Sequence, residues 1–310
     1  MDIKKCNLCP RNCGIDRTDR TNRTDRTERT SGGRGFCGAK DKIKISWFGL
    51  HFGEEPAISG FRGSGTIFFC HCNLKCVFCQ NWQISQECSN CQGYSFDEVV
   101  EMMFNLQKKG AHNINLVTPT IWAFWLKGII KKAKEKGLKI PVLWNSNAYE
   151  KTEILKEFEG LVDIYLPDYK YNIEKLAVKY SFAPSYSTIA QKAILEMQKQ
   201  VGDLKTENGV AKKGLIVRHL ILPNAIENTK GCLKFISSIS RGVHLSLMSQ
   251  YNPLYKAKEF GEINRPISLQ EFEAAKKMVE GFGIKNGWIQ EFGGSVKCLN
   301  PDFNKNNPFE

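Results

Sequence analysis

The sequence lacks an apolar run long enough to cross a membrane. Its longest apolar stretch, around residues 116–126, is interrupted by Thr118, Pro119 and Thr120, whereas a spanning helix needs about 20 apolar residues. The amino terminus, MDIKKCNLCP, lacks the apolar core of a secretory signal peptide. We therefore expect no membrane partner and a cytoplasmic location, where thiols stay reduced.

Acidic residues are also scarce. Asp and Glu number 32 against 44 Lys and Arg, which gives a formal charge of +12. A basic protein attracts acidic partners, but the aromatic and arginine clusters that read single-stranded RNA are absent, so we do not expect a nucleic-acid partner. With 42% hydrophobic and 25% charged residues, the 310-residue chain is ordinary for a globular protein, which excludes a disordered or collagen-like chain.

Cysteine, in contrast, is abundant, and ten of the twelve cysteines lie in the first 91 residues. Clustering of this kind indicates ligand chemistry, because packing roles would scatter cysteines along the chain. Cys72, Cys76 and Cys79 form a C-x3-C-x2-C spacing. Three thiolates this close can hold one face of a cuboidal iron–sulfur cluster and leave one iron open, whereas electron-transfer clusters take four cysteines. Zinc or three buried thiols are the alternatives, but zinc sites usually combine two distant cysteine pairs.

A second cysteine set lies at the amino terminus and consists of Cys6, Cys9, Cys13 and Cys37. Four thiolates complete either a structural zinc site or an auxiliary iron–sulfur cluster, and the sequence leaves both open.

The remaining cysteines have weaker patterns. Cys88 and Cys91 form a C-x2-C pair, and Cys70 lies two residues before the signature. They could complete an auxiliary site, act as redox thiols or have no role. We expect no role for Cys232 and Cys298.

The chain from residue 64 onward alternates between short apolar runs and segments of helical period. The predicted strands cover residues 66–69, 113–117, 141–144, 161–166, 215–222 and 243–248. The predicted helices cover residues 95–109, 121–136, 151–158, 186–200, 227–240 and 269–280, and the first and last open with capping boxes, Ser95 with Glu98 and Ser268 with Glu271. This alternation predicts an α/β fold with a parallel sheet that curls toward a barrel.

Three regions are expected. Residues 1–40 form a Cys-rich segment, residues 41–298 the barrel, and residues 299–310 a flexible tail. An RTx repeat at residues 17–30 interrupts the first region. A basic arm for nucleic acid is one interpretation of the repeat, but its alternating charges and lack of apolar residues favour a solvated loop insertion.

The signature resembles that of the radical SAM superfamily, with Phe78 as the aromatic residue in C-x3-C-x-aromatic-C. Five further segments resemble the branch of proteins similar to the pyruvate-formate-lyase-activating enzyme: CNLCPRNCG (6–14), GFCGA (35–39), NLVTPT (115–120), YLPDYKY (165–171) and VRHLILPN (217–224). The resemblance implies a partial (β/α)6 TIM-like barrel with a small Cys-rich N-terminal extension.

The resemblance also implies the cofactors. Cys72, Cys76 and Cys79 would hold a [4Fe-4S] cluster whose open iron is chelated by S-adenosylmethionine. Reduction, by reduced flavodoxin or ferredoxin, would release methionine and a 5′-deoxyadenosyl radical that abstracts hydrogen from a substrate. The N-terminal cysteines would hold zinc or an auxiliary iron–sulfur cluster.

The remaining site residues are implied by their place after successive strands. Phe78 would lie against the adenine. Thr118 and Thr120 stand where the family usually has a Gly-Gly-Glu run that meets the amino group of the cofactor. Asn145 and Asn147 would bind ribose or carboxylate, or simply close the strand.

Three charged residues complete the expected cofactor site. Asp168 and Lys170 resemble the Asp-Leu-Lys run of glycyl-radical-activating enzymes, in which the acid approaches the cofactor's amino group and the lysine its carboxylate. Arg218 lies within an apolar strand and needs an anionic partner, for which the cofactor carboxylate is a candidate. His219, next to it, is expected to be a core histidine.

The expected function is therefore hydrogen abstraction by a radical SAM enzyme, and activation of a glycyl radical enzyme or another protein substrate is one candidate reaction. Modification of RNA or of a peptide is an alternative. A non-catalytic metal-binding interaction module is another, motivated by the Thr-Pro-Thr departure at residues 118–120.

Overall fold

A ten-stranded sheet curves through the part of the chain that the computed structural model describes, namely residues 1–18, 35–88, 90–293 and 300–310. The strands follow the order β10-β9-β8-β6-β5-β4-β2-β1-β3, and β7 pairs with β8 outside this path. All strands from β2 to β10 on this path are parallel, while β1 pairs antiparallel with β2 and β3. The bounds are β1 Ile43–His51, β2 Ser64–Phe69, β3 Gln92–Tyr94, β4 Ile114–Val117, β5 Val142–Ser146, β6 Ile164–Pro167, β7 Lys205–Glu207, β8 Val210–Leu220, β9 His244–Met248 and β10 Asn286–Ile289.

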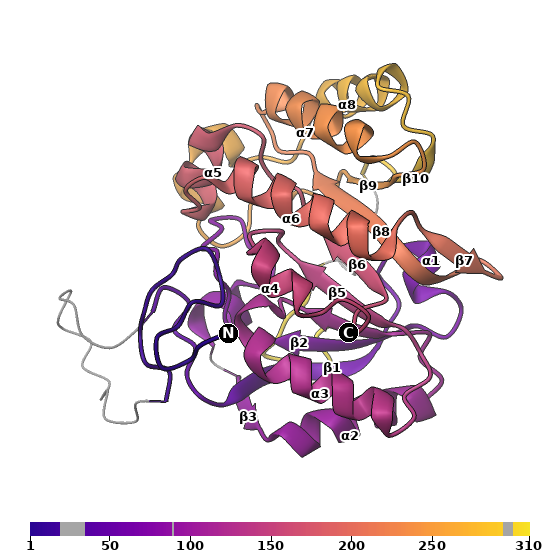
Figure 1. The fold of residues 1–310 in the computed structure, drawn as a ribbon. Helices are drawn as coiled ribbons and strands as arrows, with labels where there is room; N and C mark the ends of the chain where they lie inside the picture. Colours follow the sequence, from indigo (N-terminus) through magenta and orange to yellow (C-terminus); the bar gives the residue numbers. More distant parts are fainter. Residues whose placement is uncertain (19–34, 89, 294–299) are drawn as a thin grey trace, which may run out of the picture.

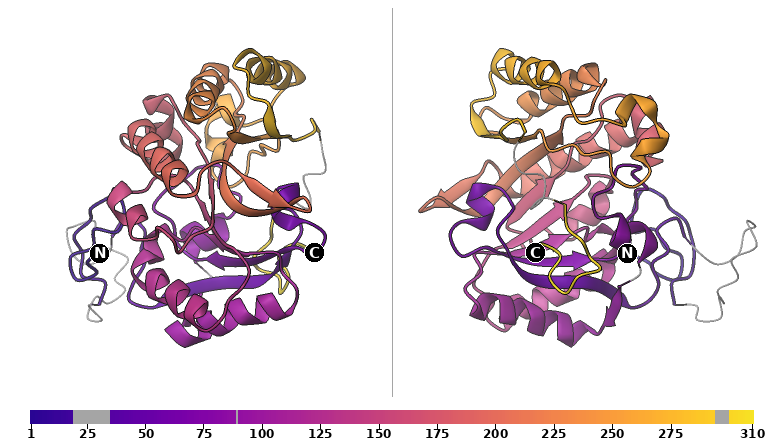
Figure 2. Two further views of the ribbon diagram at one scale, coloured as in Figure 1. Left: turned by 45° about the vertical axis from the view of Figure 1, so that its right-hand side comes forward. Right: turned by 180° about the vertical axis from the view of Figure 1, so that it is seen from behind.

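The larger helices cover the outer face of this sheet (Figures 1 and 2). The helices of the described residues are α1 Pro56–Ser59, which lies on the inner face, and α2 Phe96–Lys108, α3 Ala123–Glu135, α4 Thr152–Lys156, α5 Glu174–Ser181, α6 Tyr186–Val201, α7 Ile226–Ile239 and α8 Leu269–Gly281. A π-helical turn, Gln83–Glu87, follows the signature loop. Among the described residues, every helix is too short or too polar to span a membrane.

The central strands are buried on both faces, which is why they read as continuous apolar runs. Every residue of β2, β4, β5 and β6 is buried. Side chains alternate between the faces: Ile67 and Phe69 pack in the large core beneath the helices, and Phe68 packs on the inner face with the C-terminal segment. The amino-terminal part of the inner face is filled by α1, whose Ala57 and Ile58 pack on β5, β6 and β8.

The predicted fold class is confirmed. The six predicted strands correspond to β2, β4, β5, β6, β8 and β9, and the six predicted helices to α2, α3, α4, α6, α7 and α8. Both capping boxes are formed, and each serine hydroxyl accepts a hydrogen bond from the backbone amide of the glutamate three residues on. The prediction missed β1, β3, β7, β10, α1 and α5.

The C-terminal segment differs from the flexible tail that the sequence predicts. Residues 300–310 lie along the inner face of the sheet (Figure 2). Phe303 is 2% exposed, and its ring lies 5.2 Å from that of Phe68. Gln83 donates to Asp302 over 2.9 Å and accepts from the backbone amide of Phe303 over 2.9 Å. Two phenylalanines within an Asn- and Pro-rich segment supply the apolar surface for this packing.

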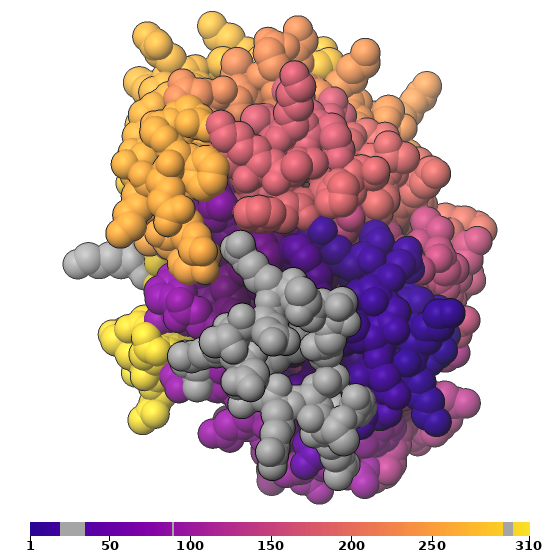
Figure 3. All heavy atoms as spheres, turned by 90° about the vertical axis from the view of Figure 1, so that its left-hand side faces the viewer, coloured from indigo at the N-terminus to yellow at the C-terminus, as the bar shows by residue number. Residues whose placement is uncertain are grey.

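The N-terminal Cys-rich segment forms a surface patch beside the barrel (Figure 3, indigo). Of the RTx repeat, residues 19–30 lie outside the described residues, as does Cys298. Arg17, which opens the repeat, is buried rather than solvated. Its guanidinium donates to the carbonyls of Ile121 and Lys40 and stacks on Trp122 and Trp125, so the repeat begins with an anchor to the barrel.

Candidate functional site

A cavity of about 160 Å³ opens at the carboxyl ends of the parallel strands. Because these strands end at the same edge of the sheet, residues far apart in sequence meet there. Ten of the eleven residues predicted for the cluster and S-adenosylmethionine line it: Cys72, Cys76, Phe78, Cys79, Thr118, Asn145, Asn147, Asp168, Lys170 and Arg218.

The three signature thiols approach the cavity from the loop that follows β2. Each has a polar neighbour: the amide of Asn147 donates to Cys72 Sγ over 3.3 Å, the hydroxyl of Ser181 donates to Cys76 Sγ over 3.0 Å, and Cys79 Sγ lies 3.3 Å from the Ser85 hydroxyl.

Burial raises the pKa of Cys72 to about 12 and that of Cys79 to about 11. Buried, hydrogen-bonded sulfurs fit an iron–sulfur cluster, which draws its ligands from thiolates and is tuned by donors to sulfur. Binding such a cluster would displace the thiol protons.

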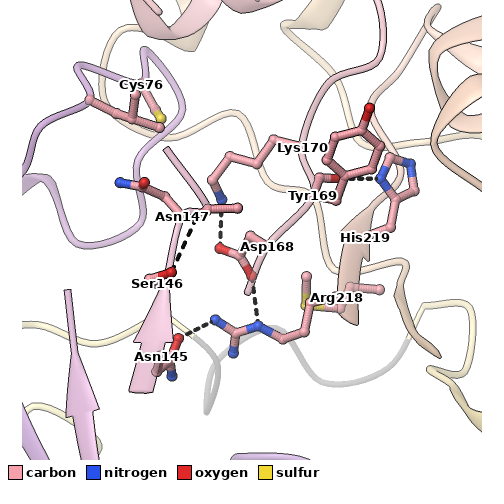
Figure 4. A network of polar contacts seen from close by, with 12 residues as sticks. Cys76, Asn145, Ser146, Asn147, Asp168, Tyr169, Lys170, Arg218 and His219 are labelled. Carbon is pink, nitrogen blue, oxygen red and sulfur yellow. Dashed lines mark hydrogen bonds and ion pairs between the residues drawn. The ribbon is translucent and has the colours of Figure 1, made fainter. Parts of the chain in front are cut away.

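A charged network lies on the other side of the cavity (Figure 4). The Arg218 guanidinium donates from Nε to Asp168 over 2.6 Å and from a terminal nitrogen to the amide oxygen of Asn145 over 2.6 Å. Lys170 Nζ donates to the second oxygen of Asp168 over 2.7 Å. Burial alone would raise the pKa of Asp168, but Arg218 and Lys170 outweigh it and lower that pKa, so the carboxylate is ionised.

Glu54 is a member of this network that the sequence analysis missed. It follows β1, and its carboxylate accepts from Arg218 over 3.3 Å, from Asn115 over 2.9 Å and from Asn145 over 3.4 Å. Burial raises the pKa of Glu54, although Arg218 opposes the shift. The only signal in the sequence is the acidic pair Glu54 and Glu55 before Pro56, and this pattern is equally typical of the start of a helix.

A second cavity of about 370 Å³ adjoins the first, and both are lined by Asn145 and Arg218. Glu54 and Glu55 also line it. Oε2 of Glu55 has no hydrogen-bond partner among the described residues, and burial raises the pKa of this carboxyl group. The second cavity therefore carries two buried carboxyl groups and Arg218 next to the cluster site.

Thr118 and Thr120 have different positions. Thr118 lines the cofactor cavity with a φ of 62°, a conformation that is strained for a β-branched residue. Thr120 does not line the cavity. It begins a helical turn after Pro119 and is 1% exposed, and its hydroxyl donates to the buried Glu150 over 2.8 Å. The Thr120 hydroxyl, which was expected to contact the cofactor, therefore lies in the core, because the chain turns away from the cavity at Pro119.

Two further predictions concern aromatic and histidine side chains. The Phe78 ring lies 5.6 Å from that of Tyr251 and is 8% exposed at the cavity wall. His219 is a core histidine, as predicted. Its two ring nitrogens contact the Tyr169 carbonyl at 2.8 Å and the Thr229 hydroxyl at 3.1 Å, and burial lowers its pKa to about 4.

The four N-terminal cysteines surround one small cavity together with Arg17. Cys6 and Cys9 are buried, and Cys13 and Cys37 are half-buried. Burial raises the pKa of Cys9 to about 12. The structure thus gathers the four predicted ligands, and the choice between zinc and an iron–sulfur cluster stays open. Cys232 packs in the core on α7.

Relatives of the chain are found among proteins of Methanocaldococcus jannaschii, and no family model matches it. The chain is 32% identical over 290 residues to the uncharacterized protein MJ0674, covering 91% of this chain and 76% of that protein. It is 24% identical over 305 residues to the uncharacterized protein MJ0808, covering 92% of this chain and 80% of that protein.

Two solved structures share the fold. Streptococcus suis SuiB bound to S-adenosylmethionine matches with a TM-score of 0.50 at 12% identity, over 71% of this chain and 48% of that chain. The FeFe-hydrogenase maturase HydG from Carboxydothermus hydrogenoformans matches with a TM-score of 0.50 at 11% identity, over 71% of this chain and 50% of that chain. The chain spans about half the length of each, and at these identities the likeness concerns the fold alone.

Proposed function

The chain belongs to the same family as the uncharacterized protein MJ0674, and we propose that it is a radical SAM enzyme that cleaves S-adenosylmethionine reductively. One observation carries this proposal. The three signature thiols and the Asp168–Lys170–Arg218 network line the same cavity at the carboxyl end of a parallel sheet. When bound, a [4Fe-4S] cluster and S-adenosylmethionine supply the carbon–sulfur cleavage and the hydrogen abstraction.

The residues of the chain bind and orient the cofactor. Asp168 is an ionised carboxylate suited to an ammonium group, while Lys170 and Arg218 are cations suited to a carboxylate. The methionine part of S-adenosylmethionine carries both groups. All three side chains are mostly buried, with side-chain exposures of 15–17%, so their charges act with little screening by water.

The hydrophobic wall of the cavity supports the same assignment. Phe78 and Met248 line it together with polar groups, which suits an adenosyl group that has a flat aromatic base and a polar sugar. Asn145 and Asn147 supply amide groups for the sugar hydroxyls.

For the substrate, we propose a backbone glycine of a partner glycyl radical enzyme, with reduced flavodoxin or ferredoxin as electron donor. The adjoining cavity supports a substrate site because it shares Asn145 and Arg218 with the cofactor cavity. Electron paramagnetic resonance of the activated partner tests this step, and a glycyl radical that depends on the enzyme, the reductant and S-adenosylmethionine is the expected result.

The experiment that tests the enzyme itself is anaerobic reconstitution with iron and sulfide, followed by reduction and addition of S-adenosylmethionine. We expect 5′-deoxyadenosine and methionine in equal amounts. Cys76→Ala should abolish cluster absorbance and cleavage, whereas Cys232→Ala, a buried cysteine on α7, should retain both.

The alternatives predict other outcomes of that experiment. A non-catalytic module would retain cluster absorbance without releasing 5′-deoxyadenosine, and calorimetric titration would detect no binding of S-adenosylmethionine. An enzyme acting on RNA would cleave S-adenosylmethionine and would also retain tRNA on a filter in a salt-sensitive manner.

A further inference from the structure

Three cysteines outside the signature gather at one point behind the cluster loop. Cys70 directly follows β2, and Cys88 and Cys91 lie between the π-helical turn and β3. Their three sulfur atoms all lie within 4.8 Å of one another, and the sulfur of Cys91 lies at disulfide-bonding distance from both Cys70 and Cys88. Cys91 cannot form disulfides with Cys70 and Cys88 at the same time, so a disulfide accounts for only two of the three sulfurs and leaves the third beside them.

A histidine lies beside the group, next to Cys88. Nε2 of His71 lies 3.4 Å from Sγ of Cys88. The imidazole also hydrogen-bonds the backbone of Cys37. A second hydrogen bond of this kind fixes the ring orientation of metal-binding histidines. His71 is held in turn by its backbone amide, which donates to the carbonyl of Ile84 over 2.9 Å.

We propose that Cys70, His71, Cys88 and Cys91 bind a single zinc ion. Three thiolates and one imidazole are a common tetrahedral donor set of structural zinc. Sulfurs that share one zinc at about 2.3 Å lie roughly 3.8 Å apart. The three sulfurs are within 4.8 Å of one another, and zinc binding would move Cys91 away from the other two, to which it lies at bonding distance. Binding releases the three thiol protons and requires no oxidant, whereas a disulfide requires one.

The site has a structural consequence for the signature loop. Cys70 and Cys88 flank the segment that carries Cys72, Cys76 and Cys79, so the ion closes that segment into a loop. Neighbouring Asn90 donates to the carbonyl of Phe303 over 2.7 Å, which ties the site to the C-terminal segment. Cys70, Cys88, Cys91 and His71 are therefore positioning residues for the cluster ligands and have no contact with the reacting atoms.

Metal analysis of the full chain tests the proposal. The protein is purified anaerobically, and its zinc content is measured by mass spectrometry in the wild type and in five variants. Cys88→Ala and Cys91→Ala should each lose one zinc ion per chain. Cys232→Ala, Cys76→Ala and Cys9→Ala should retain that ion, because they alter the core, the signature and the N-terminal set. The zinc measurement does not depend on cleavage of S-adenosylmethionine, so it can fail or succeed independently of the proposed function.

A second measurement distinguishes loss of the metal site from loss of the fold. Cobalt replacing zinc should give the ligand-field absorption of a tetrahedral thiolate site in Cys9→Ala, in which the N-terminal cysteine set is incomplete. The double variant Cys9→Ala/Cys91→Ala should lose this absorption with an unchanged circular dichroism spectrum. The proposal is overturned if Cys88→Ala and Cys91→Ala keep the full zinc content, or if the metal-free wild type takes up no zinc. It is also overturned if Cys91 forms a disulfide with Cys70 or Cys88 in the freshly isolated protein. The same holds if these cysteines are found to bind an iron–sulfur cluster instead of zinc.

Discussion

Arg218 Nε donates to Oδ1 of Asp168 over 2.6 Å, and the same guanidinium reaches Glu54 over 3.3 Å. One cation from β8 thus joins the residues that follow β6 and β1. A backbone hydrogen bond also joins β8 to the segment after β6, because the amide of Tyr169 donates to the carbonyl of Arg218 over 2.8 Å. The relative position of these strand ends is therefore fixed by both charge and backbone hydrogen bonds.

The first prediction concerns this cation. Arg218→Gln leaves the carboxylates of Asp168 and Glu54 without their guanidinium partner. Breaking a buried pair in this way costs about 3–5 kcal/mol, so the free energy of unfolding in urea should fall by that order. Binding of S-adenosylmethionine, followed by calorimetry, should be lost as well. Arg241→Gln, at an exposed position, should change neither quantity, and an unaltered unfolding midpoint in Arg218→Gln would contradict the assignment.

The second prediction concerns the strained Thr118, whose φ is 62°. Glycine adopts this conformation without the penalty of about 1–2 kcal/mol that a side chain incurs, although it also loses more backbone entropy on folding. Thr118→Gly should therefore stabilise the protein by about 0.5–1 kcal/mol and bind S-adenosylmethionine more weakly, because the hydroxyl is gone.

Thr118→Ala separates these two effects. It retains the backbone penalty and removes the hydroxyl, so binding should weaken without a gain in stability. Urea unfolding and calorimetric titration measure the two quantities, and a destabilised Thr118→Gly would show that the side chain is held by packing rather than under strain.

Most of the barrel could be predicted because its strands are buried on both faces and its helices carry local start signals. The apolar runs of β2, β4, β5 and β6 and the capping boxes at Ser95 and Ser268 are local features. In contrast, β1 pairs antiparallel with β2, and its register shifts between Ile45 and Trp47. Pairing of this kind depends on a distant partner, so the short-range pattern does not reveal it.

Outside the cysteine signature, the site could be predicted where its residues lie in or directly after an identified strand. Asn145 lies near the end of β5 and Asp168 directly follows β6, and both were found for that reason. Glu54 follows the unidentified β1 and was missed. Thr120 was expected in the cavity because it stands near the end of β4, but the helical turn that starts at Pro119 carries it into the core.

A third prediction concerns the pH dependence of stability. Glu271 accepts two hydrogen bonds from Arg265 and two from the backbone amides of Asn224 and Ser268, and chiefly the Arg265 side chain lowers the pKa of Glu271 to about 2. The unfolded value is about 4.3, so the folded protein holds fewer protons between these values. The stabilisation is complete above about pH 5 and is lost as the pH falls toward 2.

Glu271→Gln should remove this contribution, about 1–3 kcal/mol at neutral pH for hydrogen bonds to a charged group. The difference between wild type and variant in urea unfolding should shrink as the pH falls from 5 to about 3. The matched change Glu273→Gln lies on the same helix with an ion pair to Lys276 that is 37–46% exposed, and it should cost less than about 1 kcal/mol. A difference for Glu271→Gln that does not vary with pH would rule out the charge as its source.

The last prediction decides between a packed and a frayed C-terminal segment. Phe303 is 2% exposed, while Phe292 is 42% exposed. Removing a buried phenylalanine ring costs about 3–5 kcal/mol because both burial and packing contacts are lost, so Phe303→Ala should lower the urea midpoint strongly, whereas Phe292→Ala should shift the free energy of unfolding by less than about 0.5 kcal/mol. If residues 300–310 were frayed, both substitutions would have equally small effects, and Phe68 would already be open to solvent. A large effect confined to Phe303→Ala would therefore establish that the segment is part of the inner wall.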